Sequence, residues 1–242
     1  MIAIGGVARS LAMQLPEDEY VAGLWRNDMP RSLLWAILKE TELCERPGLY
    51  RAPSWSWVSV EGYIYSTNFS EEIGSLIIEY VSAFVSVTTD LLTNAFGKLK
   101  SSTLRLKGPL LTLDFGELSH NFNGIFHAAS MMPMYDDSPG CPRFHIVMLD
   151  YKNDVLSNLH FMPICFREKT WLMPDLFGNG YIGLILAPTT DSRGHFQRRG
   201  LLWLDVSEIP MDHNPPWKME QRHSWSDYET DHGDVIYTIS IL

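Results

Sequence analysis

The sequence predicts a mainly β fold, an antiparallel β-barrel of seven to eight strands with an N-terminal helical cap. Apolar residues recur at helical spacing up to about residue 45, and they alternate with polar residues after the turn sequence Arg46–Pro47–Gly48. The later apolar runs follow one another at intervals of roughly 10 to 25 residues, which favours a barrel built from successive strands. We therefore expect one domain over residues 1–242, with the cap at 1–45 and the barrel at 50–242.

The cap is predicted to hold two or three short helices. Apolar stripes run through residues 2–15, 20–25 and 33–38. In the second stripe the apolar residues fall at i, i+1, i+4 and i+5, which is helical spacing, and acidic residues 17–19 precede it, a favourable charge for a helix N-terminus. Pro16 separates the first two stripes.

The barrel strands are predicted from runs rich in β-branched and aromatic residues or in alternating polarity. They are residues 50–61, 76–88, 102–115, 143–150, 156–166, 180–188, 199–206 and 235–242. Asp191–Ser192–Arg193–Gly194 is the clearest hairpin loop. The stretches near 116–142 and 207–234 are rich in polar residues and proline, and we interpret them as long loops.

Charge and composition exclude several classes of partner. With 19 basic and 29 acidic residues the formal net charge is −10, which disfavours binding to nucleic acid or to anionic lipid. No stretch reaches the roughly 18 apolar residues of a membrane-spanning helix. The three cysteines show no CxxC spacing, so we expect reduced thiols and a cytoplasmic location. The sequence leaves a homodimer open.

The usual catalytic and cofactor motifs are missing from the sequence. It contains no GxSxG, HExxH, phosphate-binding loop or dinucleotide fingerprint, so we expect no cofactor and no metal. The histidines between residues 213 and 232 have loose spacing in a polar segment and are interpreted as a solvated loop. Cys165 lies in an apolar strand pattern, where an inert buried thiol is expected.

Aromatic residues carry the candidate binding site. The chain has 8 Trp, 10 Tyr and 11 Phe, and the run from Arg51 to Trp57 combines two indoles with a guanidinium and hydroxyl groups. Such a set suits the wall of a small-molecule pocket at a barrel mouth. The commoner role of such a set is a core face sealed by tryptophan, with Arg51 paired to a carboxylate. For the pocket we predict catalytic roles for Arg51, His145 and His160, and substrate contacts from Trp55, Trp57, Tyr63 and Trp203.

Several runs resemble the region that follows the HET domain in fungal heterokaryon-incompatibility proteins. They are IGGVARSLAM from Ile4, YVAGLW from Tyr20, RSLLW from Arg31 and YRAPSWSWVSVEG from Tyr50, with LRLKGPLL, YIGLILAP and RRGLLWLDV later in the chain. The HET domain itself would precede residue 1, so its cell-death activity is not implied for these residues. The alternative function that this resemblance implies is a non-enzymatic interaction module in fungal self/non-self recognition.

By size, setting and chemistry, the chain is also similar to cofactor-free fungal hetero-Diels–Alderases of tropolone-sesquiterpenoid biosynthesis. This similarity implies a secondary-metabolite enzyme that joins a polyketide-derived tropolone quinone methide to a terpene alkene. Such a pericyclic reaction needs a shaped apolar cavity, stacking surfaces and one or two donors that polarise a carbonyl. The expected partner is then an apolar small molecule derived from a polyketide or a terpene.

Overall fold

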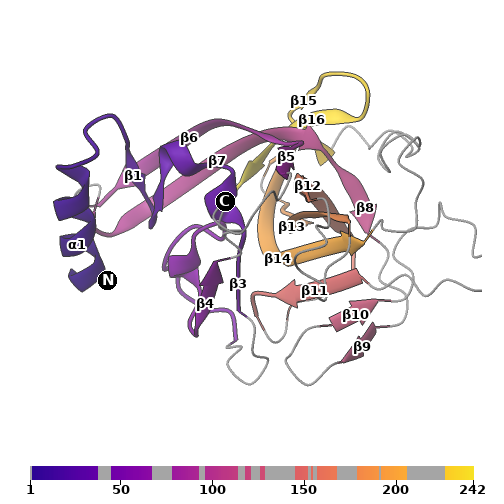
Figure 1. The fold of residues 1–242 in the computed structure, drawn as a ribbon, viewed down its shortest axis with the longest axis horizontal. Helices are drawn as coiled ribbons and strands as arrows, with labels where there is room; N and C mark the ends of the chain where they lie inside the picture. The colour runs from indigo at the N-terminus through magenta and orange to yellow at the C-terminus, as the bar shows by residue number, and fades with distance from the viewer. Residues whose placement is uncertain are drawn as a thin grey trace, which may run out of the picture.

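The fold is mainly β, with one α-helix among the residues described (Figure 1). The computed structural model describes residues 2–37, 45–66, 78–92, 96–113, 118–120, 126–128, 145–151, 154, 157–167, 179–190, 192–205 and 227–242. Helix α1 (Ile2–Ala12) confirms the first predicted stripe. Figure 1 shows α1 beside the outer end of the ribbon formed by β6 (Ala83–Leu91) and β7 (Leu99–Pro109).

The other two predicted helices of the cap are wrong. Residues 20–25 form a β-hairpin of β1 (Tyr20–Val21) and β2 (Leu24–Trp25), because the two residues between them, Ala22 and Gly23, have positive φ angles of 51° and 95°. The third stripe gives one 3₁₀ turn, Arg31–Leu33, and the strand β3 (Trp35–Ile37), which pairs with β4 (Ile64–Ser66).

The strand predicted at residues 50–61 is also wrong. Ser56 and Ser59 form hydrogen bonds with near neighbours in the chain, so the backbone turns here instead of pairing with a neighbouring strand. The Ser56 hydroxyl accepts from the Val58 N–H at 3.1 Å and the Ser59 N–H bonds the Ser56 carbonyl at 3.0 Å, which produces the 3₁₀ helix Trp57–Ser59. Serine and asparagine side chains commonly compete with sheet ladders in this way.

The remaining strands form one large sheet. Its members besides β6 and β7 are β5 (Ile78–Tyr80), β8 (Leu111–Leu113), β9 (Leu118–His120), β10 (Phe126–Ala128), β11 (His145–Leu149), β12 (Leu159–Arg167), β13 (Gly180–Pro188), β14 (His195–Asp205), β15 (Thr230–Asp231) and β16 (Ile236–Ile241). Each strand predicted after residue 76 has a counterpart, and β13 has the predicted bounds. Strands β9, β10 and β15 lie within the predicted long loops, whose other residues mostly fall outside the described ranges.

The sheet follows the order β5-β12-β13-β14-β11-β10-β9. Strand β16 also pairs with β14, β7 pairs with β16, and β6 pairs with β7. Most pairs are antiparallel, but β14 and β16 pair in parallel at His195–Ser240 and Phe196–Ile241, so the sheet is mixed. A closed barrel is not confirmed among the described residues. The predicted 191–194 loop does connect the antiparallel pair β13 and β14.

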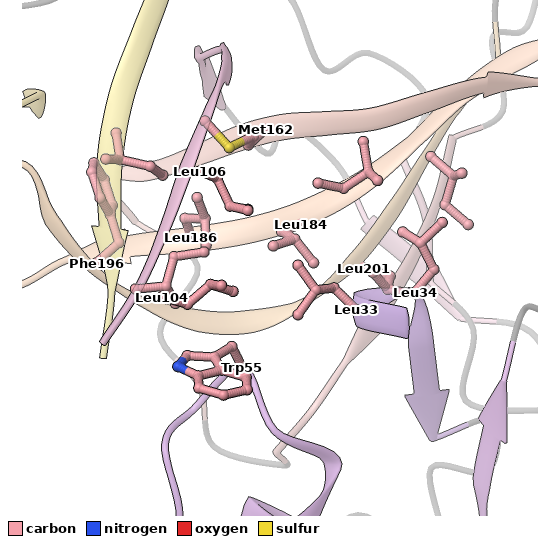
Figure 2. Close-up of a cluster of buried hydrophobic side chains, with 14 of the residues drawn as sticks. Leu33, Leu34, Trp55, Leu104, Leu106, Met162, Leu184, Leu186, Phe196 and Leu201 are labelled. Carbon is pink, nitrogen blue, oxygen red and sulfur yellow. The ribbon is translucent and has the colours of Figure 1, made fainter. Parts of the chain in front are cut away.

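Strand β13 is buried on both faces, because its apolar side chains alternate between two hydrophobic clusters. Leu184 and Leu186 belong to the cluster of Figure 2, whereas Ile185 belongs to the cluster on the opposite face. Leu33, Leu34 and Trp55 from the N-terminal quarter pack into the first cluster. This packing fixes the N-terminal segments on one face of the sheet, where they build the site described next.

Candidate functional site

The β1–β2 hairpin and the Ser56–Trp57 segment are fastened to one another. The Ser56 hydroxyl donates to the carbonyl of Ala22, and the Trp57 indole N–H donates to the carbonyl of Gly23 at 2.8 Å. The hairpin turn requires glycine here, since a Cβ on Gly23 would lie 2.8 Å from a methyl group of Val58. The N–H edge of the Trp57 ring system is thereby held beside the hairpin.

A second aromatic wall comes from Phe96. Its ring stacks on Tyr20 with centroids 5.5 Å apart and an interplanar angle of 22°, and the Arg9 guanidinium lies 5.5 Å from its centroid. Gly5 of α1 brings the helix close to this segment, because a Cβ there would lie 2.6 Å from the Phe96 carbonyl oxygen. Burial raises the pKa of Tyr20, so its phenol stays protonated at neutral pH.

These elements enclose a cavity of about 130 Å³, which we call the Trp57 pocket. Its lining residues are Gly5, Tyr20, Ala22, Gly23, Arg51, Ala52, Trp57, Val58, Val60, Phe96, Gly97 and Leu99. Arg51 is the one charged residue among these lining residues, as far as the described part of the chain goes. The pocket therefore combines an apolar, aromatic interior with a single guanidinium, the composition of many small-molecule sites.

A second cavity, of about 360 Å³, adjoins the first at Arg51 and Ala52. We call it the Arg46 pocket. Its lining residues are Arg46, Pro47, Leu49, Tyr50, Arg51, Ala52, Ser54, Ser59, Tyr151, Gln197 and Leu242. Arg51 thus contributes to both pockets. Its Nη1 bonds the Glu61 carboxylate at 2.5 Å, with 39% of the Arg51 side chain and 61% of the Glu61 side chain exposed.

Arg46 is held in place at the wall of the second cavity. Its guanidinium lies 4.1 Å from the centroid of the Tyr151 ring and donates to Asp154 at 3.1 Å. Asp154 also accepts from Arg199 at 2.8 Å, so one carboxylate serves two guanidinium groups. The Tyr151 hydroxyl donates to the Ser59 carbonyl at 2.8 Å, and burial raises the pKa of Tyr151.

Beneath this wall a buried ion pair ties the N-terminal segments to the sheet. Arg198 donates from Nε to Asp150 at 2.9 Å, and its terminal nitrogens donate to the carbonyls of Leu33 and Trp35. Its guanidinium lies 3.5 Å from the centroid of the Trp35 ring. Burial raises the pKa of Asp150 and lowers that of Arg198, while the attraction between the two charges opposes both changes.

Of the sequence-predicted site residues, the structure brings together Arg51 and Trp57. Trp55, which lies in the cluster of Figure 2, and Trp203 are core residues of the first cluster, and the buried His160 packs edge-on against Phe196 at 5.3 Å. Tyr63 is 78% exposed and lines neither pocket. The side chain of His145 lies outside the described residues. The roles assigned to all seven residues stay predictions.

Tyr20, Phe96 and Arg46 are pocket residues that the sequence reasoning missed. Tyr20 was assigned to a helical stripe, and Phe96 lies in a stretch without a distinctive motif. The only sequence signal for Tyr20 was its place in the YVAGLW run that accompanies APSWSW. Arg46 was interpreted as part of a turn.

The predicted inertness of Cys165 agrees with its surroundings. The side chain is buried in the first cluster, and burial raises the pKa of its thiol to about 12. The thiolate, which is the nucleophile, is therefore scarce at neutral pH. Within the described ranges, no group of three or more His, Cys, Asp or Glu side chains is arranged to hold a metal ion.

No helix in the described part of the chain is both long enough and apolar enough to cross a bilayer.

No protein-family model, no curated protein and no solved structure matches the chain.

Proposed function

We propose that this chain binds a small aromatic molecule in the Trp57 pocket, with Arg51 donating hydrogen bonds to an oxygen atom of that ligand. The observation that carries the proposal is that Arg51 lines a cavity whose walls include Tyr20, Trp57 and Phe96. Aromatic walls supply stacking area, and a guanidinium supplies a fixed fork of donors.

The finer proposal is a cofactor-free hetero-Diels–Alder reaction. In this proposal the ring of the quinone methide occupies the Trp57 pocket and the terpene alkene occupies the larger Arg46 pocket. Arg51 lines both cavities, so it could polarise the carbonyl oxygen of the diene while the two partners lie next to each other. The cycloaddition forms its two σ bonds from the π electrons of the partners and consumes no other reactant.

The binding proposal is tested by NMR of the indole N–H groups, with the Trp57 signal assigned from its loss in Trp57→Phe. Titration with benzyl alcohol or tropolone is expected to move the Trp57 signal. The signals of Trp55 and Trp203 should move much less, because both side chains are buried in the core. Equal movement of all three signals, or none at millimolar ligand, contradicts the proposal.

The reaction proposal is tested by incubating the chain with a tropolone quinone methide and a terpene alkene and measuring cycloadduct against buffer. Loss of one preorganised donor typically costs 10²-fold or more in rate, so Arg51→Gln should be close to the buffer rate. Trp57→Phe, which keeps an aromatic wall, should lose roughly 10-fold. A wild-type rate equal to that in buffer contradicts the reaction.

A second candidate is the non-enzymatic module derived from a HET protein. It is favoured by the bonds that join two of the HET-like runs, since Ser56 and Trp57 of the later run donate to Ala22 and Gly23 of the earlier one. These residues then have a structural role that needs no ligand. Neighbouring terpene cyclase and polyketide synthase genes would favour the enzyme, and a HET reading frame directly upstream would favour the module.

We also propose that the large sheet closes into a barrel. Strands β7 and β8 are separated by Leu110 alone, and they pair with β16 and β12 respectively. If β7 and β8 act as one bent strand, the pairings β7–β16–β14–β13–β12–β8 return to their starting point. This arrangement supports a small barrel whose interior is the packed cluster of Figure 2.

A further inference from the structure

We infer that the ligand is a monocyclic aromatic acid, whose carboxylate replaces Glu61 on Arg51 while its ring enters the Trp57 pocket. The inference rests on the proposed function and adds the chemical class of the ligand. It also assigns Glu61 as the resident counter-ion that the ligand must displace.

The size of the Trp57 pocket limits the apolar part of the ligand to one ring. An apolar protein cavity of about 150 Å³ holds a benzene molecule. The Trp57 pocket has about 130 Å³, and its walls include Trp57 and the rings of Tyr20 and Phe96, which stack on each other. A fused bicyclic ring system would exceed this volume, so further atoms of a larger ligand would have to extend past Arg51.

The charge around the pockets favours an anion. The described lining residues of the two cavities include Arg46 and Arg51 and no Asp or Glu side chain. Behind the wall, Asp154 is the carboxylate partner of both Arg46 and Arg199, so this group of three carries one excess positive charge. The Arg51–Glu61 pair is itself neutral, so this excess lies on the Arg46 side of Arg51, where it favours an acidic group on the ligand in a chain of net charge −10.

Arg51 has donors available for that acid. Glu61 accepts from Nη1, and no other hydrogen bond joins Arg51 to a described residue. A ligand carboxylate that accepts two parallel bonds from Nη1 and Nη2, the geometry that guanidinium groups favour, takes the place of Glu61 on Nη1. The Arg51–Glu61 pair is largely exposed and hence weak, so exchange of one carboxylate for another is inexpensive.

The test is isothermal titration of the intact chain with benzoate and with benzyl alcohol, which share a ring and differ in charge. Four proteins are compared: wild type, Arg51→Gln, Glu61→Gln and Arg26→Gln. Arg26 is a matched control, because it also forms an exposed pair with a glutamate, Glu19, at 3.0 Å, and it lines neither cavity. Melting temperatures show whether each variant is folded.

Benzoate is expected to bind wild type more tightly than benzyl alcohol does. Arg51→Gln should weaken benzoate binding roughly 10- to 100-fold, as the loss of a charge-assisted hydrogen bond does. Glu61→Gln should increase the affinity for benzoate by up to about 5-fold, because the carboxylate that competes for Arg51 is gone. Benzyl alcohol binding should weaken only a few-fold in Arg51→Gln, which loses a hydrogen bond to a neutral oxygen, and should change little in Glu61→Gln. Arg26→Gln should behave as wild type with both probes.

Equal affinity of wild type for the two probes overturns the inference and leaves the proposed pocket intact. So does benzoate binding that is unchanged in folded Arg51→Gln. If Arg51→Gln does not fold, the comparison of the two probes on wild type and on Glu61→Gln still decides. Failure of both probes to bind wild type at millimolar concentration overturns the proposed function as well.

Discussion

Replacing Asp150 with asparagine should lower the free energy of unfolding by about 3–5 kcal/mol, the usual cost of removing one partner from a buried ion pair. The change keeps the size of the side chain and one of its oxygen acceptors. It removes the negative charge beside Arg198, whose side chain is 0% exposed. The guanidinium then stays buried without a counter-ion, because its other hydrogen-bond acceptors are the neutral carbonyls of Leu33 and Trp35.

This cost is large for a chain of this size. Domains have free energies of unfolding of about 5–15 kcal/mol, so the substitution removes roughly a third to a half of a mid-range value. For 150–250 residues, 1 kcal/mol corresponds to a change of about 2–4 °C in melting temperature, so the expected fall is roughly 6–20 °C. The hydrogen bonds from Arg198 to the carbonyls of Leu33 and Trp35 should weaken as well.

Urea unfolding of Asp150→Asn and of a surface control measures the effect. Asp90→Asn is the control, since Asp90 pairs with Lys100 at 3.1 Å and both side chains are more than half exposed. The control should lie within about 1 kcal/mol of wild type. If Asp150→Asn also lies within 1 kcal/mol of wild type, with an unchanged m-value, Arg198 does not tie the N-terminal segments to the sheet as argued.

Two further predictions concern single side chains. The first uses a chain carrying Cys44→Ser and Cys141→Ser, in which Cys165 is the remaining thiol. At neutral pH the native Cys165 thiol should react with Ellman's reagent on the order of 10³-fold more slowly than the same thiol in the unfolded chain, because burial raises its pKa to about 12. Comparable rates with and without urea would contradict this prediction. Gly23→Ala should destabilise by about 1–3 kcal/mol, since the residue has φ +95° and its Cβ would lie within 2.8 Å of a neighbouring side chain. Gly6→Ala is its control: nothing lies within 4 Å of that Cβ and the site is helical, so thermal unfolding should show a gain of about 0.5–1 kcal/mol.

The sheet was predictable where one periodicity dominates a long segment. Strand β13 combines glycine, β-branched and leucine residues in an apolar run bounded by Asn179 and Pro188, and its bounds were predicted correctly. The hairpin at residues 20–25 was not predictable from the sequence. The four apolar residues that flank Ala22 and Gly23 fit a helical stripe as well as they fit two strands joined by a two-residue turn. What decides is the tertiary contact of that turn with Ser56 and Trp57.

The site was predictable only where its residues are neighbours in the sequence. Arg51 and Trp57 lie within one motif, and they line the same pocket. Tyr20 and Phe96 join them through the packing of the hairpin and of α1, which no local pattern encodes. Trp203 belongs to the core because side chains alternate along β14 and its side chain points toward the interior cluster.

The measurement that tests the central claim most directly is a crystal structure of the chain at saturating benzoate. The account predicts the ring between Tyr20, Trp57 and Phe96, with the carboxylate on the Arg51 guanidinium and Glu61 turned away. An unoccupied Trp57 pocket at saturating benzoate, or benzoate bound elsewhere with the Arg51–Glu61 pair intact, would contradict it.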